Sequence, residues 1–143
     1  MRKIFVLIQC SLPTIQLFGW SILCGVMGTL ILAGFFSGMM SLETLSLLLP
    51  LIVGGNAAIS GYMLIERSED EITWKKTIAA VVGMAVAMLS CVSINTLCFK
   101  AGIFFLMSGY QALAATAVGI LGGLSGGVLA VKYRELKAQA SSV

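Results

Sequence analysis

The sequence contains no histidine and only two prolines. Histidine is the usual general base near neutral pH and the commonest metal ligand, so its absence excludes the usual forms of both chemistries. A catalytic nucleophile also needs an adjacent base, and no carboxylate lies within the four long apolar stretches of this chain. The sequence therefore predicts no enzyme, no catalytic site, no metal site and no cofactor.

Charge is scarce as well. Only 10% of the residues are charged and 59% are hydrophobic, with a mean hydropathy of +1.03, whereas a soluble domain carries about 25% charged residues. Proton relays and coupled-ion sites place an ionisable residue inside a membrane span, and the apolar stretches contain none. The sequence gives no sign of proton- or ion-coupled transport.

The four cysteines form no CxxC pair, and their spacing matches no zinc-site pattern. They are Cys10, Cys24, Cys91 and Cys98. We interpret them as small apolar packing residues.

Four stretches without any charge dominate the chain. They cover about 14–37, 45–65, 77–98 and 108–131. A hydrocarbon core of about 30 Å is crossed by about 20 helical residues, so each stretch is long enough to span it. The pattern predicts an all-α integral membrane protein, with residues 1–143 forming a single domain of four transmembrane helices in two hairpins.

The N-terminal residues 2–12 precede Pro13, which lacks an N–H donor and disfavours helix at Leu12. We therefore expect a short interfacial segment there and a first span that begins near Thr14. A second boundary is marked by Ser68 and Glu71, whose spacing is that of a capping box. It predicts that the third helix begins near Glu69.

Basic residues are distributed very unevenly between the two ends of the predicted helices. One side holds only Lys100, and the other holds Arg2, Lys3, Arg67, Lys75, Lys76, Lys132, Arg134 and Lys137. Lys and Arg accumulate on the cytoplasmic side of membrane proteins. We expect both termini in the cytoplasm, with the bacterial inner membrane as the location. Because the basic residues flank spans, they do not indicate a nucleic-acid partner.

The two predicted outer connections are short. Residues 38–44 are expected to form a tight turn, whereas 99–107 are too apolar for a free loop and either lie in the interface or lengthen the fourth helix. Glu43 and Lys100 are the only charges on this side, and we consider an ion pair between them.

Small residues recur every fourth position in the predicted spans. The rows comprise Ala115, Gly119, Gly123 and Gly127, then Gly122 and Gly126, then Ala79, Gly83 and Ala87, and finally Gly34 and Gly38. Such GxxxG-type rows let helix backbones approach closely in lipid. Because the last span has two adjacent rows, we expect one of them to face another subunit.

The amides within the predicted spans include Asn56, Asn95 and Gln111. They could line a polar site, or they could simply bond neighbouring helices. Asn56 is the one nearest the middle of its span.

These features lead to three functional hypotheses. The first is an accessory, structural or assembly subunit of a larger membrane complex. The second is a homo-oligomeric channel or transporter for a neutral solute, and the third is a membrane immunity, exclusion or holin-like protein. The expected partners are the lipid bilayer and other membrane helices, from the same chain or a different one.

Overall fold

The computed structural model describes residues 2–68, 75–103 and 106–140, apart from the side chains of residues 2–14 and Lys75. Within these ranges the chain forms four α-helices and no β-strand. The helices are α1 (Arg2–Ser37), α2 (Leu42–Arg67), α3 (Lys75–Lys100) and α4 (Gly109–Ala140). Each contains a segment long and apolar enough to cross a membrane. The prediction of an all-helical protein with four potential membrane spans is confirmed.

The described helices are somewhat longer than the charge-free stretches from which they were predicted. Helices α2 and α3 have 26 residues each, which at 1.5 Å per residue gives about 39 Å. Helix α4 continues to Ala140, because Lys132–Lys137 consists mainly of good helix formers and contains neither glycine nor proline. The predicted start of the third helix at Glu69 lies outside the described residues.

Helix α1 differs from the expectation at its N-terminal end. It begins at Arg2 and continues through Pro13 to Ser37 without a break. A proline removes one backbone hydrogen bond but does not have to end a helix, since the adjacent turns keep theirs. The placement of residues 2–12 along the membrane interface stays a prediction.

The connection between α3 and α4 begins with a Schellman motif, in which the last turn of a helix is closed by a left-handed residue. Gly102 has φ +79°, and its N–H donates to the Phe99 carbonyl (3.1 Å), while the Ile103 N–H donates to the Cys98 carbonyl (2.9 Å). Helix α4 then begins at Gly109. The described residues of the connection therefore do not lengthen the fourth helix, which was one of the two expected alternatives.

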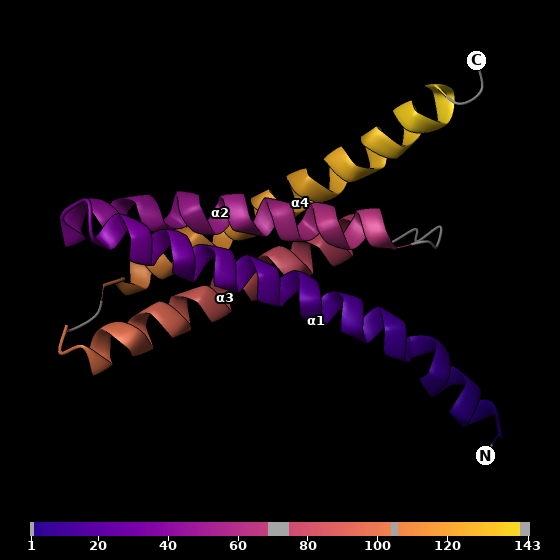
Figure 1. The fold of residues 1–143 in the computed structure, drawn as a ribbon, viewed down its shortest axis with the longest axis horizontal. Coiled ribbons are helices and arrows are strands. Elements are labelled where there is room, and N and C mark those ends of the chain that lie inside the picture. Colours follow the sequence, from indigo (N-terminus) through magenta and orange to yellow (C-terminus); the bar gives the residue numbers. More distant parts are fainter. Residues whose placement is uncertain (1, 69–74, 104–105, 141–143) are drawn as a thin grey trace.

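Helix α2 contacts each of the other three helices (Figure 1). Helix α4 packs against α2 and α3, and α1 also packs against α2 and α3. Among the described residues no contact joins α1 to α4. The turn after α1 and the connection after α3 lie at one end of the bundle, which we call the connection end, and the outer parts of α1 and α4 extend from the other (Figure 1).

The α1–α2 turn is short, as predicted. Ser41 is the N-cap of α2, with its hydroxyl accepting from the Thr44 N–H at 3.4 Å. Glu43 in the first turn and Arg67 in the last both complement the helix dipole. These residues give α2 well-defined ends at both sides of its apolar segment.

Candidate functional site

The main small-residue row of α4 lies against α3. A Cβ on Gly119 would lie 2.7 Å from the Ala87 Cβ, and one on Gly127 would lie 2.7 Å from the Ala79 Cβ. Between them, a Cβ on Gly83 of α3 would collide with the Gly119 carbonyl oxygen. The two backbones approach so closely that this interface has no room for larger side chains.

The second row of α4 lies against α2. Added Cβ atoms on Gly122 and Gly126 would collide with the carbonyl oxygens of Gly54 and Ala58, respectively. A Cβ on Gly61 of α2 would likewise collide with the Gly123 carbonyl oxygen. Ala115, at the start of the main row, is also fully buried.

Both rows of α4 are thus occupied within the chain. This corrects the expectation that one of them is left for another subunit. Consecutive helical residues point about 100° apart, so Gly122 and Gly123 face different directions. Because α4 contacts both α2 and α3, each row meets one of those helices.

The two glycines predicted on α1 have no such neighbours. A Cβ on Gly34 would meet nothing within 4 Å, and one on Gly38 would meet only the carbonyl oxygen of Phe35, at 3.6 Å. Close contact of α1 is instead made by two other small residues of the same span, Gly25 and Gly28. A Cβ on Gly25 would collide with the Ser60 hydroxyl, and Gly28 lies against the Asn56 side-chain oxygen.

Asn56 is 7% exposed, between α2 and α1. Its Nδ2 donates to the carbonyl of Ile52, one turn earlier in the same helix, at 2.9 Å. The expected alternatives were a polar site and a hydrogen bond to a neighbouring helix. The recorded bond is instead within α2, with the amide oxygen packed onto the backbone of Gly28.

Asn95 and Gln111 stabilise local structure at the connection end. The Asn95 Oδ1 accepts from the Met107 N–H at 3.2 Å. Gln111 forms a capping box with Ser108, in which the Ser108 N–H donates to Oε1 (2.9 Å) and the Gln111 N–H donates to the Ser108 hydroxyl (3.4 Å). The Gln111 Nε2 also donates to the Ser46 hydroxyl of α2 at 3.2 Å. The three amides therefore have separate partners.

Several buried hydroxyl groups were not among the predicted site residues. Ser21 of α1 is 3% exposed, and its hydroxyl donates to the Ser60 carbonyl of α2 at 2.6 Å. Thr29 and Ser60 are fully buried and donate to carbonyls in their own helices. Their sequence could have predicted a helix contact, because Ser21, Gly25 and Thr29 are spaced four residues apart and form another small-residue row.

The charged residues at the helix ends occupy different environments. Glu43 in the first turn of α2 and Lys100 in the last turn of α3 are both exposed, and their ion pair stays a prediction. At the opposite end, the Arg134 guanidinium of α4 donates to the Glu66 carbonyl and, at 2.7 Å, to the Ser68 carbonyl. Arg134 thus caps the C-terminus of α2, a role that the charge count did not reveal.

The cysteines whose side chains are described, Cys24, Cys91 and Cys98, are free thiols. Cys91 is buried in the apolar core and Cys98 is half-buried beside it. In the described part of the chain, no group of three or more Cys, Asp or Glu side chains is arranged to hold a metal ion.

Comparisons with protein-family models, with curated proteins and with solved structures give no match to this chain. The fold alone therefore defines its class. Over the residues that the structure describes, it is an all-helical protein with four helices long and apolar enough to span a membrane.

Proposed function

We propose that this protein is a small multi-pass protein of a bacterial inner membrane that acts as an accessory or assembly subunit of a larger membrane complex. The observation that carries the proposal is the exposure of α1. In its most apolar segment 22% of the residues are buried, against 50% in α2. A helix that makes few contacts within its own chain leaves more of its surface free to contact a helix of another chain.

The exposed face of α1 has the composition of a helix-packing surface. Trp20, Leu23, Met27 and Ile31 are all exposed, and their spacing places them along one stripe of the helix. Gly19 leaves a hollow beside Trp20 and Leu23. A side chain of a partner helix can fill such a hollow and gain dispersion contacts, which drive helix association in lipid.

The remaining helices would act as a rigid support for this face. Glycines join α4 to α2 and to α3 by backbone contact, and capping groups fix both ends of α2. The separate partners of Asn56, Asn95 and Gln111 give less support to the alternative of a channel or transporter for a neutral solute. A membrane immunity, exclusion or holin-like role is favoured by no particular residue.

The proposal is tested by extracting the tagged protein in a mild detergent, measuring the mass of the complex and identifying its components. We expect a stoichiometric complex with at least one other membrane protein. Gly19→Leu should weaken that complex, because it fills the hollow beside Trp20. Gly55→Leu is the matched control, since an added Cβ meets nothing within 4 Å at either position.

Three results would contradict the proposal. A protein that is monomeric at all concentrations has no partner helix. A complex that Gly19→Leu leaves intact does not use the α1 face. Solute flux from the purified protein in liposomes would favour the channel alternative instead.

A further inference from the structure

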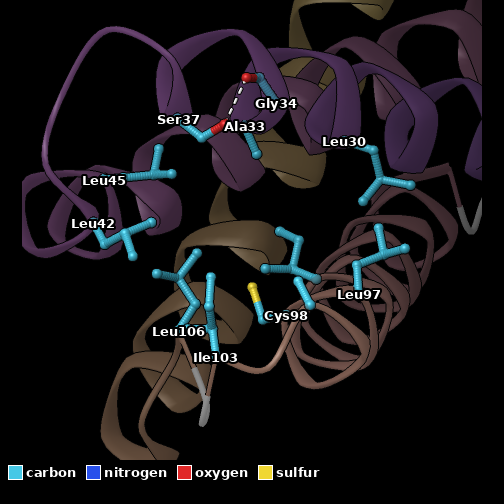
Figure 2. Close-up of a pocket in the computed structure, with 12 residues that line it drawn as sticks. Leu30, Ala33, Gly34, Ser37, Leu42, Leu45, Leu97, Cys98, Ile103 and Leu106 are labelled. Atoms are coloured by element: carbon cyan, nitrogen blue, oxygen red, sulfur yellow. Dashed lines mark hydrogen bonds between the residues drawn. The ribbon is translucent and has the colours of Figure 1, made fainter.

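An apolar cavity of about 250 Å³ lies at the connection end of the bundle. Figure 2 shows its side chains converging from four parts of the chain. Leu30 comes from α1, Leu45 from α2 and Leu97 from α3, while Ile103 and Leu106 come from the α3–α4 connection. The cavity is partly open to the surface, so a ligand can enter it.

The Schellman motif at the end of α3 shapes this cavity. The left-handed Gly102 reverses the chain, and the Ile103 N–H bonds back to the Cys98 carbonyl. This bond holds Ile103 beside Cys98, as expected for the hydrophobic contact that accompanies this motif. Both residues line the cavity, so one wall is formed by the turn itself.

The lining is mainly apolar and has no strongly polar side chain that is free to bind a ligand. The Ser37 hydroxyl donates to the Gly34 carbonyl of its own helix at 2.7 Å, as drawn in Figure 2. The Cys98 thiol is only a weak donor, and the remaining lining side chains are hydrocarbon, apart from Gly34. An occupant must therefore present an apolar surface to this cavity.

The volume defines how much of an apolar molecule fits. A cavity of about 150 Å³ holds one benzene, and pockets for whole drug-sized ligands begin at about 300 Å³. A cavity of about 250 Å³ accommodates part of a hydrocarbon chain whose remainder continues outside. Since the helices around it are long and apolar enough to span a membrane, lipid is the hydrocarbon that we expect next to this cavity.

Two charges of opposite sign lie next to the lining residues along the chain. Lys100 precedes Ala101, and Glu43 follows Leu42; both charged residues are exposed. A phosphate is attracted to the lysine ammonium and a lipid ammonium to the carboxylate. The two charges cancel, so they match a headgroup with no net charge.

We propose that this cavity binds one acyl chain of a zwitterionic glycerophospholipid with an ammonium headgroup. The chain occupies the space between Leu30, Leu97 and Ile103, while Lys100 binds the phosphate and Glu43 the ammonium. The site would make the protein sensitive to the lipid next to α1, independently of any protein partner.

The test uses the full-length protein in nanodiscs with a phosphatidylethanolamine that carries a photoactivatable diazirine in its acyl chain. After illumination, mass spectrometry maps the labelled residues. We expect labelling to concentrate on the segments around Leu97–Cys98 and Ile103. Even labelling along the exposed faces of all four helices would overturn the proposal.

Gly34→Leu supplies the decisive variant, because Gly34 lines the cavity and an added Cβ there meets nothing within 4 Å. We expect its labelling to fall about tenfold, the ratio that corresponds to lost contact with about two methylene groups. Gly55→Leu, equally unobstructed but outside this lining, should label like the wild type. Equal labelling of both variants would overturn the acyl-chain site.

A competition experiment with unlabelled lipids tests the headgroup assignment separately. Competition by unlabelled phosphatidylethanolamine should exceed competition by phosphatidylglycerol in the wild type, and Lys100→Gln should weaken the competition by both. Lys100→Arg should restore it. Preference for the anionic lipid, or no effect of Lys100→Gln, would overturn the roles of Lys100 and Glu43.

Discussion

At the scale of single residues, the glycines fall into two kinds that look the same in sequence. Gly83 and Gly123 lie in backbone contact between α3 and α4, whereas Gly34 and Gly55 would each accept a Cβ without meeting another atom. A methyl group at the first kind forces two helices apart. At the second kind it only changes helix propensity, which favours alanine over glycine.

We therefore predict that Gly123→Ala destabilises the bundle by about 1–3 kcal/mol, as overpacking does in well-packed cores. The new Cβ would collide with the Ala79 carbonyl oxygen and lie 2.9 Å from the Gly83 Cα. Unfolding in mixed micelles measures the loss, with Gly55→Ala as the matched control. Equal stability of the two variants would show that α3 and α4 are not in backbone contact at Gly123.

At the scale of elements, the ends of α2 depend on groups from other parts of the chain. Ser41 caps its N-terminus from the preceding turn, and Arg134 of α4 donates to carbonyls at its C-terminus. The carbonyls in the last turn of a helix lack partners inside the helix. A cation there also complements the negative end of the helix dipole.

Arg134→Ala should therefore loosen the last turn of α2, at a cost of about 1 kcal/mol for hydrogen bonds from a partly exposed charge. Hydrogen exchange of residues 64–68 should become faster, while exchange at the middle of α2 stays unchanged. Arg134→Lys should restore part of the protection, and Lys132→Ala, at an exposed position, is the control. Unchanged exchange in Arg134→Ala would mean that the cap contributes nothing in the membrane.

At the scale of the whole molecule, α2, α3 and α4 all contact one another, while the described residues of α1 contact α2 and α3 but not α4. The outer parts of α1 and α4 extend from the same end of the bundle (Figure 1). Lys76, Lys132 and Lys137 lie at exposed positions toward that end, and Lys100 lies at the opposite end of α3. This arrangement is the one expected if both termini face the cytoplasm, as the distribution of basic residues predicts.

The orientation predicts the behaviour of C-terminal reporter fusions. A fluorescent protein that matures only in the cytoplasm should fluoresce at the C-terminus, and a phosphatase that folds only outside should be inactive there. Because Lys and Arg near the spans set orientation, replacing Lys132, Arg134 and Lys137 together should reduce the preference. An active phosphatase on the unmodified chain would invert the proposed topology.

The sequence by itself determined the number and type of the described helices and the approximate position of their apolar segments. Hydrocarbon offers no hydrogen-bond partner, so a long stretch such as 77–98 must satisfy its backbone within a helix. The tertiary structure decided which neighbour each glycine meets, because a small residue permits close approach without selecting the partner. It also decided the roles of Gln111 and Arg134, whose hydrogen-bond partners are set by how the helices and their connections lie together. The apolar cavity likewise depends on where the α3–α4 connection folds back, and no periodicity within one helix encodes that position.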